Sequence, residues 1–165
     1  MLLDACKILK EKGYKFVCNF VGGESKEITK DIFVNAIKER GLDGMVIYHG
    51  PKYGDEKKEF FANSDVFIQP TFEDCFPLTL LEAMQYKLPI VSTDEGAVPD
   101  MVKYEANGFI CKRKDSGSTE DAIKSLLDSK DLRNQMGENG YKLFKEHFTL
   151  EVFNKNITWI LKEIV

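Results

Sequence analysis

Histidine and closely spaced cysteines are scarce in this sequence, which limits the metal chemistry that it can support. The chain has two histidines and four cysteines, and the cysteines are scattered without a CxxC pair. A structural zinc site needs such ligands at short spacing. The sequence therefore predicts no metal site, and we expect reduced thiols in the cytoplasm.

Long apolar runs and an excess of positive charge are also absent. No run approaches the length of a membrane span, and no apolar segment follows a basic one as in a signal peptide. Contact with the inner face of a membrane stays open. The net charge of -4 argues against a general nucleic-acid binder, which needs clustered Lys and Arg. A nucleotide ligand is still possible, because one small anion needs only a few local hydrogen-bond donors.

Repeats, low-complexity segments and linkers rich in Gly, Pro or Ser are missing as well. The chain has 165 residues, of which 43% are hydrophobic and 30% charged, so it can bury a substantial core. We predict a single domain over residues 1–165. Because the sequence opens on a helical pattern where an α/β domain normally opens on a strand, we expect that a first strand and its loop are lacking.

Short apolar and β-branched runs alternate with helical patterns along most of the chain. The predicted strands are residues 15–21, 45–49, 66–69, 89–92 and 108–111. The predicted helices are residues 3–12, 28–40, 55–63 and 77–87, with a short helix around Pro99. Such alternation predicts an α/β fold, a Rossmann-like open parallel sheet with helices on both faces.

The C-terminal part is predicted to be helical from Ser118 to the end. The sequence STED at 118–121 predicts a helix start, and Gly137 and Gly140 are expected to interrupt the helix. Residues 150–165 carry an apolar stripe that needs a partner, in this chain or outside it. We interpret Phe153, Ile157 and Trp159, which lie in that segment, as packing residues.

Residues 73–85 (EDCFPLTLLEAMQ) lie where a parallel sheet places its ligands, between a strand and the next helix. We expect Pro77 in the first helical position, which leaves the free N–H groups of Leu78 and Thr79, with the Thr79 hydroxyl, to face an anion such as phosphate. Glu82 follows on the same helical face. A carboxylate there could accept two hydroxyl protons from a ribose.

Each of these residues also has a simpler interpretation. Glu82 alone would be a carboxylate on a helix surface, and Asp74 would be a turn or cap residue. Gly96 lies in a turn after a parallel strand, where its backbone could contact a donor sugar or only make the turn. His49 is expected to be a strand-end residue with a satisfied hydrogen bond. The basic residues 112–114 are most simply a solvated loop.

Residues 67–100 (FIQPTFEDCFPLTLLEAMQYKLPIVSTDEGAVPD), with NGFI at 107–110, resemble the donor-binding half of the retaining glycosyltransferases of the GT-B fold, in particular family 4. The resemblance rests on two acids separated by seven residues, then Ala-Met, a Pro-Ile-Val strand and a Gly-containing turn. Three positions depart from the family pattern: Asp74 and Asp100 stand where Glu is commoner, and Pro77 stands where Gly is usual.

The resemblance implies roles for individual residues. Asp74 would contact the transferred sugar, and Glu82 the ribose. The loop and helix start that would face the diphosphate are Phe76, Pro77, Leu78 and Thr79. Pro51 and Lys52 would lie near the base. The family's basic phosphate-binding loop would precede Met1.

These roles predict the nucleotide-sugar-binding domain of a glycosyltransferase in cell-envelope polysaccharide biosynthesis. By resemblance, the whole enzyme would move a sugar with retention from a UDP-sugar or GDP-sugar to a carbohydrate or lipid-linked acceptor, without a cofactor. Its acceptor domain would be a further partner, and the isolated fragment would be inactive. Two alternatives remain open: half of a nucleotide-sugar epimerase, and a non-catalytic nucleotide-binding module.

Overall fold

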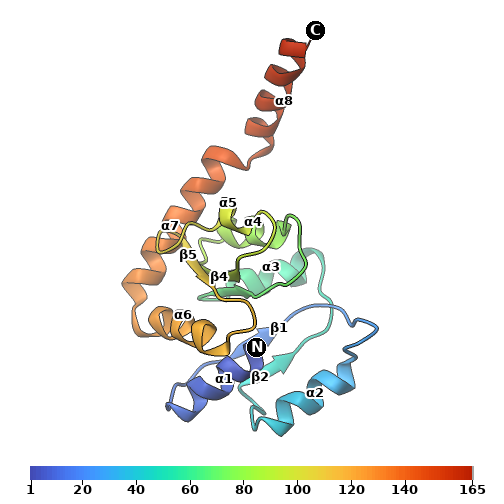
Figure 1. Cartoon of the computed structure of the whole chain (residues 1–165), viewed down its shortest axis with the longest axis vertical. Coiled ribbons are helices and arrows are strands. Elements are labelled where there is room, and N and C mark those ends of the chain that lie inside the picture. The colour runs from blue at the N-terminus through green and yellow to red at the C-terminus, as the bar shows by residue number, and fades with distance from the viewer. Residues whose placement is uncertain (165) are drawn as a thin grey trace.

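Strands and helices alternate along the first two thirds of the computed structural model, which describes residues 1–164 (Figure 1). The strands are β1 (Cys18–Phe20), β2 (Val46–Tyr48), β3 (Phe67–Gln69), β4 (Ile90–Thr93) and β5 (Gly108–Cys111). The helices are α1 (Leu2–Glu11), α2 (Lys30–Glu39), α3 (Gly54–Ala62), α4 (Leu78–Gln85), α5 (Val98–Met101), α6 (Ser116–Asp128), α7 (Lys130–His147) and α8 (Leu150–Ile164). The predicted order of elements is confirmed.

All strand pairs are parallel, as predicted, but the strands form two hydrogen-bonded groups. β1 pairs with β2, and β4 lies between β3 and β5, with Ile90 opposite both Phe67 and Gly108. Within residues 1–164, no ladder joins the two groups, where we had predicted one open sheet. The ladders are three or four residues long, and residues 15–17 and 21 of the longest predicted run lie outside β1.

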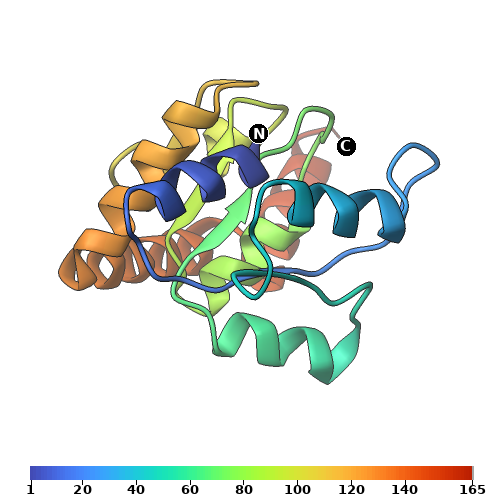
Figure 2. The ribbon, with the colours of Figure 1, turned by 90° about the horizontal axis from the view of Figure 1, so that it is seen from below.

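Helices cover both faces of the strands (Figure 2). Successive residues of a strand point to opposite faces, and β4 shows this directly. Ile90 packs with Leu80 and Met84 of α4, whereas Val91 packs with Leu9 of α1 and with helix α6. Burial on both faces explains why β4 is apolar at its start, as predicted for a central parallel strand.

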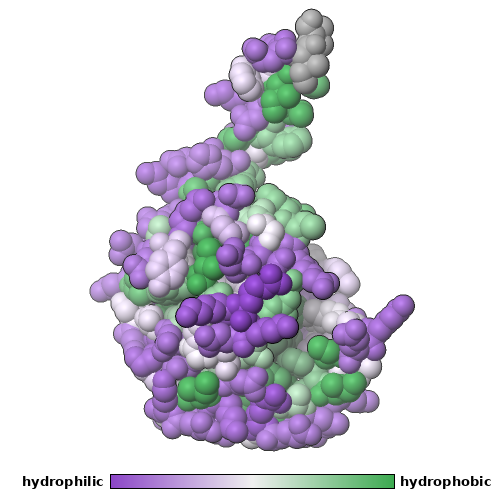
Figure 3. Space-filling model, viewed as in Figure 1, coloured by the Kyte–Doolittle hydropathy of each residue, from purple (hydrophilic) through white to green (hydrophobic). Residues whose placement is uncertain are grey.

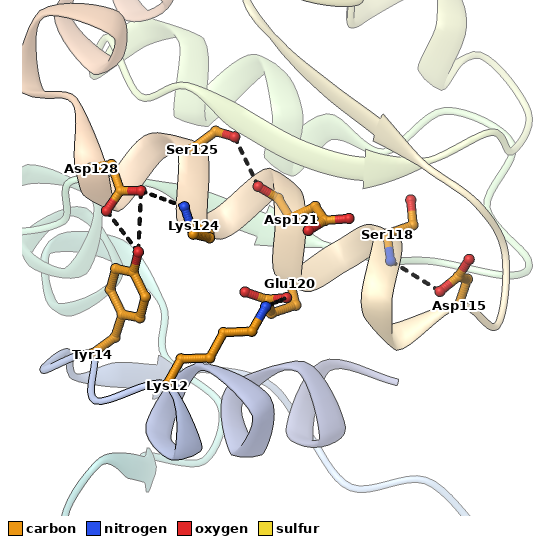
Figure 4. Close-up of polar contacts among 9 residues, drawn as sticks. All are labelled: Lys12, Tyr14, Asp115, Ser118, Glu120, Asp121, Lys124, Ser125 and Asp128. Atoms are coloured by element: carbon orange, nitrogen blue, oxygen red, sulfur yellow. Dashed lines mark hydrogen bonds and ion pairs between the residues drawn. The ribbon is translucent and has the colours of Figure 1, made fainter.

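Polar contacts close the seam between α1 and α6 (Figure 4). Lys12 Nζ lies 2.6 Å from Oε2 of Glu120, a carboxylate that is almost fully buried. The Tyr14 hydroxyl donates to Asp128, 2.9 Å from Oδ1, and Lys124 Nζ reaches the other oxygen at 2.7 Å. The hydrogen bond from Lys124, and then the one from Tyr14, lower the pKa of Asp128. These contacts hold the first helix against the C-terminal helices.

Two predictions about the C-terminal helices were wrong. α6 begins at Ser116, because the Asp115 side chain accepts a hydrogen bond from the Ser118 amide, so Ser118 lies inside the first turn. α7 continues without a break through Gly137 and Gly140. Both glycines are buried against α4 and its following turn, so they mark close packing rather than a helix end.

Gly137 and Gly140 provide a matched test of this packing. A Cβ at Gly137 would lie 2.0 Å from the Lys87 carbonyl oxygen, whereas a Cβ at Gly140 would have no heavy atom nearer than 3.6 Å. We expect Gly137→Ala to destabilise the fold by about 1–3 kcal/mol through overpacking. Gly140→Ala should be neutral or stabilising by up to about 1 kcal/mol, because alanine favours the helix. Urea denaturation measures both, and equal values would contradict the predicted packing.

Helix α8 projects from the body of the molecule, with its end farthest from the strands (Figure 1). Phe153 and Trp159 are 61% and 64% exposed, and Ile157 is also exposed, so residues 1–164 do not bury the predicted apolar stripe. Packing of these residues against a partner outside the chain stays a prediction. Figure 3 shows hydrophobic residues along this helix. Val165 and the side chain of Ile164, both within the predicted segment 150–165, lie outside the described residues.

Candidate functional site

Loops that follow β3 and β4 meet at the carboxyl edge of the strands. The buried hydroxyl of Ser92 donates to the Gln69 carbonyl, 2.7 Å away, and the Thr93 hydroxyl donates to the Thr71 carbonyl. Farther out, the Ala97 amide donates to the Cys75 carbonyl at 2.9 Å. These contacts fix the loop after β3, which carries the start of the acidic motif (Asp74 to Glu82), against the loop before α5.

Gly96 makes the closest approach between these loops. Its φ of +48° lies in the left-handed region, and a Cβ there would fall 2.1 Å from the carbonyl oxygen of Asp74. Only glycine fits a position with both features. The contact sets the distance between the turn at Gly96 and the backbone of Asp74.

The start of α4 leaves backbone donors free. Pro77 has extended ψ (99°) and is the N-cap, so the helix begins at Leu78, one residue later than predicted. Leu80 donates to the Pro77 carbonyl at 3.0 Å. Within residues 1–164, the amides of Leu78 and Thr79 have no hydrogen-bond acceptor, and no side chain caps the helix. An anion is favoured at such an uncapped helix start.

Asp74 and the Thr79 hydroxyl are joined through Gln69. The Thr79 hydroxyl donates to Oε1 of Gln69, and Gln69 Nε2 lies 3.5 Å from Oδ2 of Asp74. The other Asp74 oxygen accepts a hydrogen bond of 3.2 Å from the Phe76 amide. The hydroxyl of Thr79, predicted to face an anion, thus points to Gln69. Asp74 makes the turn expected from its simpler interpretation, and its role toward a sugar stays a prediction.

Glu82 forms an ion pair with a residue of α3. Its Oε1 lies 2.7 Å from Nζ of Lys57, and the two side chains are 35% and 32% exposed. Glu82 is therefore neither a freely solvated surface carboxylate nor a buried one. Its charge is partly balanced, and it stays accessible to a ligand that could replace Lys57.

We expect this ion pair to contribute little to folding. Partly exposed ion pairs are worth about 0–1 kcal/mol, because water solvates both charges in the unfolded chain. Glu82→Ala and Lys57→Ala should each lower the free energy of unfolding by no more than about 1 kcal/mol. Thermal and urea denaturation would check this, and a larger loss would show that Glu82 has a structural role.

Residues near the end of β2 form a third part of the edge. Pro51 is exposed, and Lys52 pairs with Glu56 at 3.3 Å. A ring nitrogen of His49 lies 2.8 Å from the Asn19 side-chain oxygen, so the predicted satisfied hydrogen bond is confirmed. Pro51 and Lys52 thus precede α3, the helix that supplies Lys57 to Glu82.

A cavity of about 410 Å³ opens beside the loop after β3. Gln69, Pro70, Thr71 and Phe72 form one wall, and the start of α1 faces them. Gln69 also accepts a hydrogen bond from the Thr79 hydroxyl, so this side chain connects the cavity to the acidic motif. A second cavity, of about 240 Å³, lies between the loop after β1 and α2, away from the motif.

The sequence did not reveal the contacts of three residues at this edge: Gln69, Lys57 and Arg113. Arg113 was predicted to be in a solvated loop, but its Nη2 donates to the Phe72 carbonyl at 2.9 Å and lies 2.8 Å from Oε2 of Glu95. Gln69 is a polar residue at the end of the apolar strand β3, and this position is a signal that could have been recognised. The partners of Lys57 and Arg113 lie in other segments, and nothing in the local sequence identifies them.

Over residues 1–164, no group of three or more His, Cys, Asp or Glu side chains is arranged to hold a metal ion. Over the same residues, no helix combines the length and the apolar character needed to cross a membrane.

The sequence profile of the family "Glycosyl transferases group 1" matches residues 1–143. A capsular polysaccharide biosynthesis glycosyltransferase, CapM of Staphylococcus aureus, is 26% identical over 156 residues. An N-acetyl-alpha-D-glucosaminyl L-malate synthase of Bacillus anthracis is 28% identical over 115 residues. The matches cover 92% and 70% of this chain but only 39% and 30% of these relatives.

Solved structures show the same arrangement of elements. The C-terminal domain of a group 1 glycosyl transferase, LpcC of Francisella tularensis, has a TM-score of 0.80 and 23% identity, and the match covers 90% of this chain and 77% of that one. HepE of Anabaena, solved with UDP and glucose, has a TM-score of 0.86 and 19% identity. That match covers 98% of this chain and 44% of HepE. At these identities the likeness establishes the fold.

Proposed function

Because the chain belongs to the group 1 family of glycosyl transferases and has the GT-B half-fold, we propose that it is the nucleotide-sugar-binding domain of a sugar-transferring enzyme. The enzyme would move a sugar from a nucleoside diphosphate to a hydroxyl of a carbohydrate or lipid-linked acceptor, with retention. Since the chain matches 30–39% of the two curated relatives, an acceptor domain would be its partner.

One observation carries the proposal: the uncapped start of α4 lies between two carboxylates. The amides of Leu78 and Thr79 would bind the diphosphate, because the positive end of the helix dipole favours an anion. Glu82 follows about one turn later and would accept the ribose hydroxyls. Asp74 precedes the helix and would accept sugar hydroxyls. This order of acceptor, anion site and acceptor matches a nucleotide sugar.

Other residues would extend the site. Phe76 and Pro77 would line the diphosphate, and Pro51 and Lys52 would lie near the base. Gly96 would offer its backbone to the sugar. The donor would be a UDP-sugar or a GDP-sugar, and UDP is present in the HepE structure of similar fold. We also propose that the enzyme acts in the cytoplasm and meets the inner face of the membrane through its other parts.

The chemistry assigned to this chain is stabilisation of a leaving group. As the bond from the sugar to the diphosphate breaks, negative charge grows on the phosphate oxygens. Amides already oriented at a helix start stabilise that charge without reorganising. The proposal therefore includes no metal or other cofactor. Lys57, once Glu82 turns to a ribose, would lose its carboxylate partner and would be a cation beside the ribose part of the site.

Titration of this chain with UDP and GDP, followed by nitrogen-15 NMR, tests the proposal and detects weak binding. We expect one of the two to shift the amides of Leu78 and Thr79. Glu82→Ala should weaken that binding about 10-fold or more, the effect of losing a charge-assisted hydrogen bond. Glu138→Ala is the matched control, since Glu138 forms an ion pair of equal length, 2.7 Å, with Lys87 in the turn just after α4.

The outcomes separate the candidate functions. Equal affinity of Glu82→Ala and the unmodified chain would exclude the ribose contact. Failure of any nucleotide to bind, in this chain and in the full-length enzyme, would favour a non-catalytic scaffold module that kept the sheet and lost nucleotide binding. Release of a free epimerised sugar by the full-length enzyme without an acceptor would favour the epimerase.

A further inference from the structure

One guanidinium bridges all three loops at the carboxyl edge of the central strands. Arg113 lies just after β5, its Nη2 donates to the Phe72 carbonyl in the loop after β3, and the same nitrogen lies 2.8 Å from the carboxylate of Glu95 in the loop after β4. The Arg113 side chain is 52% exposed, whereas that of Glu95 is only 20% exposed. It thus connects three segments that are separate in the sequence.

The Glu95 carboxylate makes this bridge energetically important. Oε2 of Glu95 is buried and, within residues 1–164, accepts no hydrogen bond, because the Arg113 nitrogen is close but lies off the hydrogen-bonding direction. A buried carboxylate oxygen without a hydrogen bond is costly unless a cation lies beside it. Arg113 is that cation, so its removal should displace Glu95 toward water.

Displacement of Glu95 would be transmitted to the acidic loop. The next residue, Gly96, contacts the Asp74 carbonyl so closely that no Cβ fits, and the Ala97 amide donates to the Cys75 carbonyl. The turn cannot move outward without breaking the Ala97 hydrogen bond, nor inward without a collision at Asp74. The position of Asp74 therefore depends on where Glu95 is held.

Core packing, rather than this bridge, anchors the body of helix α4. Leu80 and Met84 are fully buried in the core cluster of α4 and β4, and they anchor the helix that carries Leu78, Thr79 and Glu82. Loss of Arg113 should leave these groups in place. The two halves of the site thus differ in what positions them.

We propose that Arg113 and Glu95 form a positioning pair that sets the sugar-facing part of the site, Asp74 and Gly96, without setting the diphosphate and ribose part. This inference rests on the proposed function. Its consequence is that the pair governs how much the sugar adds to the affinity for a nucleoside diphosphate. Neither residue touches the nucleotide in this scheme.

The experiment compares the chain with its Arg113→Ala, Arg113→Lys and Lys112→Ala variants. Hydrogen exchange at the Ala97 amide reports the loop, and titrations report affinity for UDP, UDP-glucose, UDP-N-acetylglucosamine, GDP and GDP-mannose. In Arg113→Ala we expect Ala97 exchange to be about 10-fold faster. Affinity for the tightest-binding sugar nucleotide should fall about 5–10-fold, and that for its diphosphate should stay within about twofold.

Two variants serve as controls. Lys112→Ala removes an equal charge from the same loop, and the exposed Lys112 side chain has no ion-pair partner in residues 1–164, so this variant should behave as the unmodified chain. Arg113→Lys keeps the charge beside Glu95 but lacks the planar fork of donors, so it should restore part of the sugar-dependent affinity.

Each outcome decides the inference. Unchanged hydrogen exchange at the Ala97 amide in Arg113→Ala would overturn it. An equal loss of affinity for the diphosphate and for the sugar nucleotide would also overturn it, because such a loss indicates a general structural role. Sugar nucleotides that bind no tighter than their diphosphates would also overturn it. If the unmodified chain binds the diphosphates, the proposed function survives any of these results. If no nucleotide binds, the proposed function fails, and the inference fails with it.

Discussion

The close contact between Gly96 and the carbonyl of Asp74 is the constraint on which the candidate site depends. Two loops from neighbouring parallel strands meet there with no room for a side chain, at a backbone conformation that only glycine adopts readily. One loop carries an acid and leads into α4, and the other leads into α5. The strands set where the loops begin, and this contact sets how close they come.

The polar groups of the site are already paired with one another. Glu82 is held by Lys57, Asp74 by the Phe76 amide, and the Thr79 hydroxyl by Gln69. A ligand at this site would have to replace these contacts. Each replacement would contribute only the difference in free energy between the new hydrogen bond and the one that it replaces. The free amides at the start of α4 are the exception, because they would gain a bond without losing one. This asymmetry makes the helix start the natural first point of contact for an anion.

Charge at the edge is arranged by loops as well as by helices. Arg113 and Lys57 lie outside residues 67–100, the stretch that carries the family resemblance, yet Arg113 contacts Glu95 and the Phe72 carbonyl, and Lys57 contacts Glu82, within that stretch. Ion pairs between exposed side chains contribute little to stability. A partly buried pair such as Arg113 with Glu95 matters more for where a loop is held than for how tightly the whole chain folds.

The sequence by itself determined the order of elements, the parallel pairing and the position of the acidic motif, because short apolar runs, helical periodicity and turn residues are local signals. The predicted start of α6, Ser118, lies two residues after the observed start at Ser116, because Ser118 and the observed cap Asp115 are both typical capping residues. Gly137 and Gly140 were predicted to interrupt a helix, because a glycine that packs closely inside a helix looks the same in sequence as one that ends a helix. Only the tertiary structure decided which charges meet, because partners such as Lys57 and Glu82 lie on different helices. It also decided that the apolar stripe of α8 stays exposed over the described residues, for periodicity reveals an apolar face but not what covers it.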